Sequence, residues 1–571
     1  MSIEKIQKTA RIYALQNAVQ FNGKANPKAV VGKVIAVLQK EGFSPKILIP
    51  VVTSVTIEVN KLPFDDQKNE LERIAPELMM KEKKERDFTL PPLPNAEKGK
   101  VVTRFPPEPN GYLHIGHAKA AIVDFEYARM YNGKFILRFD DTNPENAHVE
   151  FYDAQKDDLL WLGIEWNEEY NTSDNIEKHY KFAEQLIKQN HAYVCTCDTS
   201  YIKECRFNGK ECDCRCIGSG ESLDIFKEMI SSSIDGAILR LKGDMTCDNT
   251  AMRDPTLFRI IEKEHPLQGT KYRVWPTYDF SGAVEDSISG VTHPFRTKEY
   301  ELRDECYFKL LDLLKIRKPN LMEFARLSIE GMPVSKRKIK PLIDNGDVQG
   351  YDDIRLPTLR GLKKRGILPQ AIKRFVLEQG ISKVESTVSF GILESANRKI
   401  IDPIAKRYFY VSEPVKLLVD NAPHRKKEID FHPRDKKLGS RKIDTGNIFY
   451  VEKRDMEQLG VGDVFRLKDL YNVRIKNKGD KLLGEYAGEE LISDSMKIQW
   501  TTHNYVDLRI YVPHLLFTGD KFNKDSLEKV EGYAERAVSD IKTDEIVQFE
   551  RFGFVRIENI NDNIIGYFTH K

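Results

Sequence analysis

The sequence lacks the long apolar run that a membrane-spanning helix requires. Its best candidate, residues 47–59, is interrupted by Pro50, Thr53 and Ser54, whereas roughly 18 to 20 consecutive apolar residues are needed to cross a bilayer. Near the N-terminus stand Glu4 and Lys5, with no apolar segment and cleavage site after them. We therefore expect a cytoplasmic protein that does not contact a membrane.

The sequence also lacks a large net charge of either sign. It contains no internal repeats and no low-complexity tracts. Lys and Arg number 89 and Asp and Glu number 87, so the formal net charge is only +2. A nucleic acid would therefore have to bind a local basic surface. Residues 425–442, with eight basic and three acidic side chains, are one candidate. A solvated loop is the alternative interpretation of that stretch.

Cysteine is scarce outside one short segment. Six of the eight cysteines lie within 22 residues, and these are Cys195, Cys197, Cys205, Cys212, Cys214 and Cys216. Such a cluster in a cytoplasmic protein favours metal over disulfides. Two pairs, Cys195/Cys197 and Cys212/Cys214, suit a tetrahedral structural Zn²⁺ site, although their spacing is C-x-C rather than the commoner C-x-x-C. Reduced cysteines without metal remain the alternative.

The length of 571 residues suggests about three to five domains. Helical periodicity at 10–19 and 27–39 precedes a charged run at 81–86 and a proline-rich linker at 90–94. Strands and helices then alternate as in a parallel α/β sheet: strand 101–105, helix 115–131, strand 135–139, helix from about 144 to 162, and, after an insertion at about 178–270, strand 273–280 and helix 300–314.

The C-terminal part has a different texture. Two helical patterns surround Gly361 and Gly380 within residues 345–402. After Arg407 apolar and polar residues alternate with period two, at 447–452, 463–467, 472–475, 507–512, 545–549 and 554–558. This alternation predicts antiparallel β structure in two barrels.

The most informative segment is residues 104–117, which join the first strand of the α/β region to its first helix. His114 and His117 fall on one face of the first helical turn, where free backbone N–H groups and the helix dipole favour anions. Gly111 and Gly116 remove side chains where a ligand would come close. The segment therefore predicts a phosphate-binding loop, with a proline-rich turn carrying two surface histidines as the alternative.

At these residues the chain resembles a known family. His114-Ile115-Gly116-His117 is similar to the HIGH motif of class I aminoacyl-tRNA synthetases, and residues 107–120 resemble the glutamyl and glutaminyl subgroup. The resemblance implies that ATP, with Mg²⁺, is a substrate. It also implies five regions: an N-terminal helical extension and linker (1–98), a Rossmann-like catalytic domain (99–177 and 271–344), an inserted acceptor-binding region with the cysteine cluster (178–270), a helical connector to the tRNA stem (345–404) and a β-barrel anticodon-binding region (405–571).

A second motif, residues 333–338, resembles the KMSKS loop. Lys336 matches its second lysine, whereas Pro333 replaces the first, so the grip on the leaving phosphates would depend on Lys336. Glycine and proline around the loop suggest that it moves. The resemblance implies His114, His117 and Lys336 as catalytic residues. It also implies an ATP site made of Glu108, Pro109, Asn110, Gly116, His117, Thr297, Arg326, Leu327, Val334, Ser335 and Lys336.

The amino-acid pocket is expected at the carboxyl ends of the strands. By resemblance, Asp140 would meet the α-ammonium and Tyr278 a second part of the substrate, and Arg104 is a further carboxylate candidate. Arg296 stands where glutaminyl enzymes have a small uncharged residue. A guanidinium there would pair with a side-chain carboxylate, so glutamate is the expected substrate. An exposed Arg296 paired with Glu299 is the alternative.

We therefore interpret the chain as a glutamyl-tRNA synthetase of the archaeal and eukaryotic type, because bacterial glutamyl enzymes end in helices rather than barrels. It would join L-glutamate to tRNA(Glu) through glutamyl-adenylate, as a monomer, with Arg407 reading an anticodon base. Whether tRNA(Gln) is also charged stays open. The alternatives are a glutaminyl-tRNA synthetase, a tRNA-independent HIGH-type nucleotidyltransferase, and a non-catalytic RNA-binding relative.

Overall fold

The computed structural model describes residues 3–21, 23–38, 45–75, 78, 90–479, 481–493, 495–560 and 563–571. The chain separates into two compact units, residues 1–89 and 90–571. The charged run at 81–86 lies outside the described residues. Among the helices that the structure describes, none combines the length and apolar character needed to cross a membrane.

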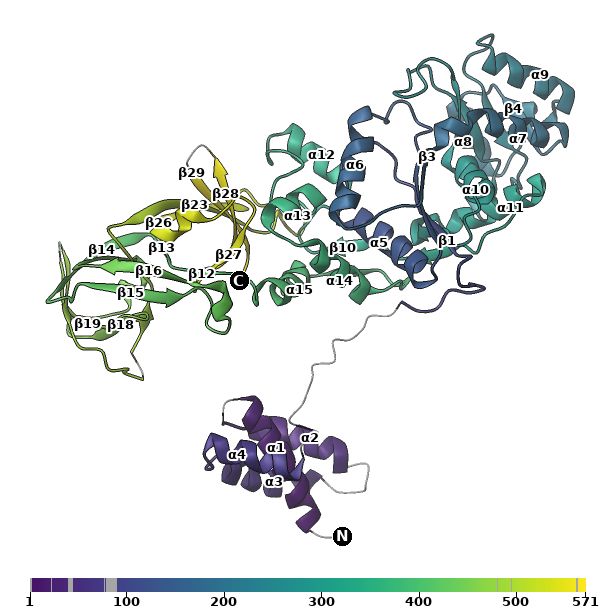
Figure 1. Cartoon of the computed structure of the whole chain (residues 1–571). Helices are drawn as coiled ribbons and strands as arrows, with labels where there is room; N and C mark the ends of the chain where they lie inside the picture. Colours follow the sequence, from purple (N-terminus) through teal and green to yellow (C-terminus); the bar gives the residue numbers. More distant parts are fainter. Residues whose placement is uncertain are drawn as a thin grey trace. The chain divides into compact units, whose positions relative to one another are not determined.

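Four helices form the described part of the first unit (Figure 1): α1 (Ile3–Gln20), α2 (Pro27–Leu38), α3 (Pro45–Val59) and α4 (Phe64–Ile74). Their inward faces share one apolar core, in which Ala14, Val34 and Val52 are fully buried. The sequence patterns predicted α1 and α2. Helices α3 and α4 were not predicted, and α3 contains Pro50, a residue that normally argues against a helix interior.

The second unit begins with a parallel sheet. Strands β1 (Val102–Phe105), β2 (Lys134–Phe139) and β3 (Glu168–Asn171) pair in that order, joined by α5 (Ile115–Met130) and α6 (Val149–Trp161). Strands β8 (Phe295–Thr297) and β9 (Met322–Phe324) are also parallel, as are β10 (Leu327–Ile329) and β11 (Ser386–Val388). The Thr292 N–H donates to the Val102 carbonyl at 2.9 Å, which sets the segment leading into β8 beside β1.

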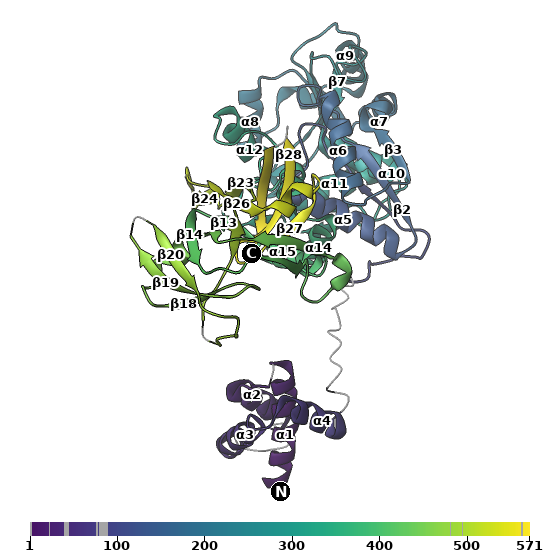
Figure 2. The ribbon, with the colours of Figure 1, turned by 60° about the vertical axis from the view of Figure 1, so that its left-hand side comes forward.

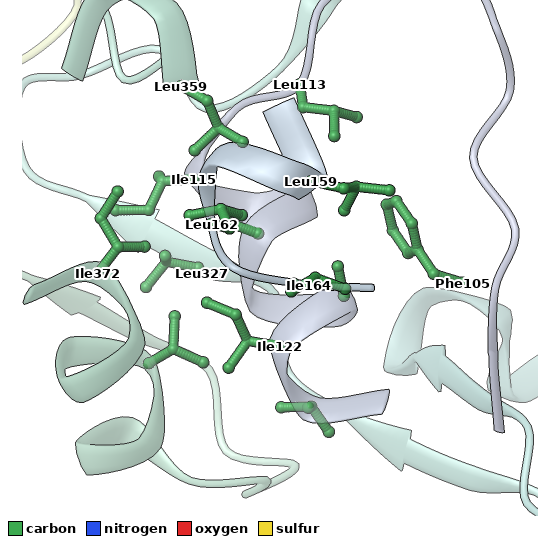
Figure 3. Packing of buried hydrophobic residues seen from close by; sticks show 14 of the residues in the cluster. Phe105, Leu113, Ile115, Ile122, Leu159, Leu162, Ile164, Leu327, Leu359 and Ile372 are labelled. Atoms are coloured by element: carbon green, nitrogen blue, oxygen red, sulfur yellow. The ribbon is translucent and has the colours of Figure 1, made fainter. Parts of the chain in front are cut away.

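The hydrophobic core of this α/β region lies around α5 (Figure 3). Ile115 and Ile122 of α5 pack with Leu327 of β10 and with Leu359 and Ile372 from the helices that follow. Because α5 begins at the phosphate-binding loop and Leu327 follows the proposed adenosine-binding arginine, this core holds two predicted parts of the site in register.

An inserted antiparallel sheet interrupts the α/β alternation, as predicted. Its strand order is β4-β5-β6-β7. The elements are α7 (Ile176–Lys188), β4 (Ala192–Cys195), α8 (Thr199–Asn208), α9 (Ser219–Ile230), β5 (Ile238–Leu241), β6 (Thr256–Ile260), β7 (Val274–Pro276), α10 (Tyr278–Ile288) and α11 (Asp304–Leu314). The predicted strand 273–280 is wrong at its end, because α10 starts at Tyr278. Asp279 in its first turn favours a helix start.

Two further boundaries differ from prediction. Helix α6 begins at Val149 rather than near residue 144, because Asn143 accepts a hydrogen bond from the Glu145 N–H at 3.2 Å and closes a turn there. Four helices begin within or after the second motif: α12 (Lys336–Asp344), α13 (Leu359–Arg365), α14 (Pro369–Gln379) and α15 (Phe390–Ile401). Three of them lie after residue 345, where the sequence predicted two.

The C-terminal region consists of two curved, nearly closed seven-stranded barrels, which confirms the predicted β architecture. One sheet has the order β12-β27-β28-β29-β23-β26-β13 and the other β21-β18-β19-β20-β14-β17-β22. The strands of the first are Arg407–Tyr408 (β12), Tyr410–Ser412 (β13), Tyr505–Pro513 (β23), Leu527–Glu535 (β26), Ile546–Phe549 (β27), Gly553–Ile560 (β28) and Asn563–His570 (β29).

The second barrel and its neighbours complete the chain. Its strands are Pro414–Asp420 (β14), Ile448–Glu452 (β17), Val464–Leu467 (β18), Asn472–Lys478 (β19), Leu482–Tyr486 (β20), Lys497–Ile498 (β21) and Trp500–Thr502 (β22), with the short helix α16 at Lys453–Glu457. Two hairpins stand apart, β15–β16 (Arg425–Asp430, Ser440–Thr445) and β24–β25 (Phe517–Thr518, Lys521–Phe522). Figure 2 shows the last strand ending beside α15, where Asn397 contacts His570 at 3.1 Å.

Candidate active site

The phosphate-binding loop ends in a capped helix, as the sequence predicted. His114 is the N-cap of α5, and its Nδ1 accepts hydrogen bonds from the N–H groups of Gly116 (3.1 Å) and His117 (3.4 Å). Nδ1 of His117 in turn accepts from the His114 N–H at 3.3 Å. The two side chains therefore satisfy backbone donors that a helix start leaves free.

Both imidazoles are neutral hydrogen-bond donors. Their rings stack with centroids 3.8 Å apart. Burial, and for His114 also the neighbouring His117, lowers the pKa of both groups, that of His117 to about 4. Because each Nδ1 accepts a backbone hydrogen bond, the single proton of each ring sits on Nε2. The pair therefore presents two N–H donors to a phosphate near neutral pH.

The second motif closes over this loop from more than two hundred residues away in the sequence. A Cβ on Gly111 would lie 3.4 Å from Cδ of Lys336, and one on Gly116 would lie 3.2 Å from Cγ1 of Val334. Lys336 donates from Nζ to the Asn110 carbonyl. Glycine is needed at position 116, where a Cβ would also lie 2.9 Å from Cε1 of His114, whereas at position 111 it lets the two motifs approach closely; the sequence suggested both glycines only for contact with a ligand.

The ammonium of Lys336 is held by a backbone carbonyl of the first motif. It is the first residue of α12, directly after the N-cap Ser335. Burial lowers the pKa of Lys336, while the nearby Glu108 carboxylate opposes that shift. Its ammonium hydrogen-bonds a carbonyl rather than a carboxylate, an interaction that a charged phosphate would readily replace.

Hydrogen bonds from α6 and from the segment before it fix the rest of the loop. Gln155 of α6 donates to the carbonyls of Glu108 (3.0 Å) and Gly111 (2.8 Å). The Glu108 side chain accepts from Asn146 at 3.1 Å and from Asn110, and its burial raises its pKa. His148 donates its N–H to the Pro109 carbonyl at 3.1 Å. Residues 108–110, which were predicted to bind ATP, are therefore fixed by hydrogen bonds to one another and to residues 146–155.

The predicted adenosine pocket lies on neighbouring strands. Thr297 ends β8 and is the register partner of Phe324 in β9. Leu327 is buried in β10, whereas Arg326 is exposed and pairs with Glu299 at 2.9 Å. Lys119 of α5, which was not predicted, donates to the Ala325 carbonyl at 2.8 Å, so the phosphate-binding helix also fixes the start of this pocket.

The amino-acid side of the site is organised by a buried ion network. Arg104 binds Asp286 through Nε (3.0 Å) and Nη2 (3.1 Å) and donates from Nη1 to the Phe295 carbonyl (2.7 Å). Arg138 donates to the same Asp286 at 2.8 Å and to Asp140 at 2.8 Å. Burial would raise the pKa of Asp286, but the two guanidiniums outweigh it and hold the pKa low.

This network changes the picture of Arg104. Three of its N–H groups are already used, and its side chain is 1% exposed. Asp140, by contrast, follows directly after β2 at the carboxyl edge of the sheet, where its backbone N–H donates to the Pro107 carbonyl at 3.0 Å. Asp140 therefore links the amino-acid side to the phosphate-binding loop.

Tyr278 and Arg296, 18 positions apart in the sequence, line the same small cavity. The residues that line it are Tyr278, Asp279, Gly282, Arg296, Arg303 and Tyr307. Arg303 pairs with Asp279 at the rim. The structure thus brings together two of the predicted glutamate-binding residues.

Arg296 is a buried guanidinium that makes no hydrogen bond among the described residues. Its side chain is 4% exposed, Nε has no partner, and the nearest carboxylate oxygen, on Asp304, is 3.6 Å from Nη1. The guanidinium carbon lies 5.0 to 5.5 Å from three tyrosine rings, those of Tyr278, Tyr300 and Tyr307. One long ion pair and aromatic rings compensate a desolvated guanidinium incompletely, so an anionic ligand that hydrogen-bonds it would stabilise it further.

The alternative interpretation of Arg296 does not hold. That alternative required an exposed side chain paired with Glu299, but Arg296 is buried and Glu299 pairs with Arg326 instead. The tyrosine cage could not be predicted, since Tyr300 and Tyr307 carry no motif. Arg138 and Asp286 were also missed, although an acidic pair, Glu285 and Asp286, inside an otherwise apolar helix was a usable signal.

Three of the four predicted zinc ligands, Cys195, Cys197 and Cys212, form one cluster, and the fourth, Cys214, lies beside Cys197. The sulfurs of Cys195 and Cys212 are 3.8 Å apart and those of Cys197 and Cys214 are 3.6 Å apart, and Cys195, Cys197 and Cys212 share one cluster. Sulfurs bound to one Zn²⁺ at about 2.3 Å stand about 3.8 Å from each other. The donor set therefore fits zinc.

A buried arginine accompanies this cluster. Arg240 lies with Nη1 3.5 Å from the Cys212 sulfur and 3.9 Å from the Cys195 sulfur. Its positive charge would compensate a zinc ion bound by four thiolates. Cys205, also buried, and the exposed Cys216 stand outside the set of sulfurs that the structure groups within its described part.

The barrels enclose a polar pocket with a volume of about 800 Å³. Lys406, Tyr408, Phe431 and Arg441 are among its lining residues. Arg407, the predicted anticodon residue, is not among them: it contacts Asp402 at 3.2 Å. The period-two alternation of the strand turns the side chains of residues 406 and 408 to the pocket and that of residue 407 away from it.

An α/β domain in which these two motifs meet at the carboxyl edge of a parallel sheet is the catalytic architecture of class I tRNA synthetases. The family model described as tRNA synthetases class I (E and Q), catalytic domain, matches residues 100–403. Two models of the anti-codon binding domain of the same synthetases match residues 405–487 and 497–558. The chain belongs to this E and Q family of class I tRNA synthetases.

Curated relatives cover the chain from end to end. A glutamate–tRNA ligase of Nitrosopumilus maritimus (strain SCM1) is 43% identical over 571 residues, which is 100% of both chains. That of Cenarchaeum symbiosum (strain A) is 42% identical over 98% of this chain and 99% of its own. That of Pyrococcus furiosus is 41% identical over 99% of this chain and 100% of its own.

Proposed function

We propose that this synthetase ligates L-glutamate to tRNA(Glu). The observation that carries the proposal is Arg296, a buried guanidinium with no hydrogen-bond partner in the described structure, in a small cavity shared with Tyr278. The names of the curated relatives support the same amino acid.

The side chain of glutamate fits this group better than that of glutamine. A carboxylate would form charge-assisted hydrogen bonds with the guanidinium and neutralise it in a desolvated site. A neutral amide would leave the positive charge uncompensated, at a cost of about 1 to 3 kcal/mol or more. The three tyrosine rings around Arg296 keep water away and enlarge that difference.

Activation of glutamate would take place where the two motifs, residues 104–117 and 333–338, meet. The α-carboxylate of glutamate attacks the α-phosphorus of ATP, which enters as its Mg²⁺ complex, and the bond to the β-phosphate breaks to release pyrophosphate. His114 and His117 donate Nε2–H groups to the phosphates, and the ammonium of Lys336 leaves the Asn110 carbonyl for the departing pyrophosphate. These groups act by positioning and by electrostatic stabilisation.

The remaining substrate contacts follow from the same arrangement. The carboxylate of Asp140, held by Arg138, receives the α-ammonium, and Tyr278 borders the substrate opposite Arg296. Arg104 is hydrogen-bonded to Asp286 and to the Phe295 carbonyl. It would therefore act on the substrate through its positive charge rather than through free N–H donors. Adenosine would lie against Thr297, Arg326 and Leu327, with residues 108–110, Gly116, Val334 and Ser335 enclosing the phosphates.

The second half-reaction transfers the glutamyl group to the tRNA. The terminal adenosine hydroxyl attacks the carbonyl carbon of the adenylate, AMP leaves, and an ester forms. The barrels would read the anticodon, for which Arg407 and the pocket lined by Lys406, Tyr408 and Arg441 are the candidate contacts. A structural Zn²⁺ held by Cys195, Cys197, Cys212 and Cys214 would fix the insertion that faces the acceptor end.

Aminoacylation of purified tRNA(Glu) and tRNA(Gln), side by side and with either amino acid, tests the proposal. We expect charging of tRNA(Glu) with glutamate and no charging with glutamine. Glutamine-dependent charging or pyrophosphate exchange, without a response to glutamate, would overturn the assignment in favour of a glutaminyl enzyme. Charging of tRNA(Gln) with glutamate would extend the substrate range without changing the amino acid.

A further inference from the structure

Two acidic side chains meet next to Arg296, and the reaction described above uses neither. Asp304 begins α11 and has a carboxylate oxygen 3.6 Å from Nη1 of Arg296. Glu323 of β9 is the register partner of Arg296 in β8. Each acid has one buried oxygen without a hydrogen-bond partner among the described residues, and the Glu323 carboxylate acts electrostatically on Asp304.

Such a pair holds one proton more readily than two charges. Two carboxylates that share a desolvated space cannot both ionise without repulsion. Burial, and then the Glu323 carboxylate, raises the pKa of Asp304 to about 7. Because Lys383 binds Glu323, Asp304 is the member of the pair that takes up the proton as the pH falls.

The charge on Asp304 decides what Arg296 can attract. When Asp304 is ionised, it neutralises part of the guanidinium charge and repels an incoming carboxylate. When Asp304 is protonated, the full positive charge of Arg296 faces the cavity. The geometry of the cage is the same in both cases, because the three tyrosine rings and not Asp304 surround the guanidinium.

We propose that Asp304, held by Glu323, is a positioning residue that sets the affinity for the substrate side chain: by taking up or releasing one proton it strengthens or weakens the pull of Arg296 on a carboxylate. The inference rests on the proposed glutamate activity and adds to it a second pair of residues and a direction of pH dependence.

Three charged groups act on Asp304 from the elements around it: Arg296 on β8, Glu323 on β9 and Lys383 before β11. The exposed Glu301 pairs with the same Lys383. Arg296 and Lys383 lower the pKa of Asp304 and are outweighed by burial and Glu323. Tyr300 and Tyr307 do not titrate near neutral pH, since burial raises the pKa of Tyr300 to about 12 and that of Tyr307 well above its usual value.

The glutamate KM of the full-length enzyme, measured with saturating tRNA(Glu) and ATP from about pH 6 to about pH 8.5, tests the proposal. We expect KM for glutamate to rise about fivefold to tenfold as the pH increases through 7, as one nearby charge in a partly buried site would cause. KM for ATP should stay constant over the same range, because the ATP site does not contact Asp304.

Two variants should move the glutamate KM in opposite directions. Asp304→Asn cannot ionise, so its KM should stay at the low-pH value throughout. Glu323→Gln removes the charge that favours protonation of Asp304, so its KM should already be high near pH 6.5. Glu301→Gln is the matched control, because Glu301 also pairs with Lys383, at 3.3 Å, yet is exposed; its profile should follow the wild type.

The outcomes separate this inference from the proposed function. Any titration of glutamate, ATP or tRNA would appear equally in Asp304→Asn, so a rise that persists in that variant overturns the role of Asp304. A flat wild-type profile overturns it as well, even if Asp304→Asn fails to fold. Absence of glutamate charging at every pH would instead contradict the proposed function itself.

Discussion

Two arginines of the catalytic domain are buried almost equally and differ in their surroundings. The side chain of Arg104 is 1% exposed and that of Arg296 is 4% exposed. Arg104 gives three N–H groups to Asp286 and a backbone carbonyl. Arg296 makes no hydrogen bond within the described residues and has only aromatic neighbours and a carboxylate at 3.6 Å.

The difference separates a structural cation from a binding one. A buried guanidinium that is fully paired keeps strands in register and has little left to offer a ligand. A buried guanidinium that makes no hydrogen bond has its N–H donors available for a ligand, and incompletely paired charges of this kind gather at functional sites. The two residues should therefore respond in opposite ways to mutation and to substrate.

The largest effect is expected from the partner of Arg104. Asp286→Asn would leave Arg104 and Arg138 without their common counter-ion, so the free energy of unfolding should fall by about 3 to 5 kcal/mol. Urea unfolding followed by circular dichroism measures it. Asp312→Asn, which breaks an exposed pair with Lys318, is the control and should cost less than about 1 kcal/mol. Equal losses would mean that the buried network is not special.

Substrate should act on the other arginine. Glutamate at 100 times its Kd should raise the free energy of unfolding by about 2.7 kcal/mol in the wild type and leave an Arg296→Met variant unchanged. The same urea titrations with and without glutamate give the result, and glutamine at equal concentration is the control. Stabilisation of the variant by glutamate would show that the carboxylate binds elsewhere.

The smallest effect is the most diagnostic of an unpaired charge. Arg296→Met removes a desolvated cation and places a polarisable side chain among three tyrosines, and Asp304, which loses its counter-ion 3.6 Å away, can take up a proton because its pKa is already raised. The free energy of unfolding should therefore change by less than about 1 kcal/mol in either direction. Arg104→Met should instead be destabilising, because it leaves part of Asp286 unpaired. A large loss in Arg296→Met would place that residue in the same structural class as Arg104.

Much of the fold could be predicted because its signals are local. The alternation of strands and helices, the period-two pattern after Arg407 and the glycines of the first motif each depend on neighbouring residues. The site could be predicted where a short motif carries it: His114, His117 and Lys336 were found this way, and the structure brings their two motifs into contact. Cys195, Cys197, Cys212 and Cys214 were found by spacing and also converge.

What could not be predicted depends on distant partners. No pattern tells that Arg104 is bound by Asp286, 182 positions later, or that Glu323 of β9 acts on Asp304 at the start of α11. The orientation of Arg407 depends on strand pairing within a barrel, so its side chain could not be assigned to one face. The start of α10 at Tyr278 was missed because the flanking residues suit a strand and a helix equally.

The ratio of kcat/KM for glutamate over glutamine, measured in tRNA(Glu) charging for the wild type and for Arg296→Cys, decides whether the unpaired guanidinium selects the substrate. The wild type should prefer glutamate by about 10³-fold or more, and the thiol variant should lose most of that preference through its activity with glutamate. A variant that keeps the wild-type ratio would contradict the account, because selection would then lie outside the tyrosine cage.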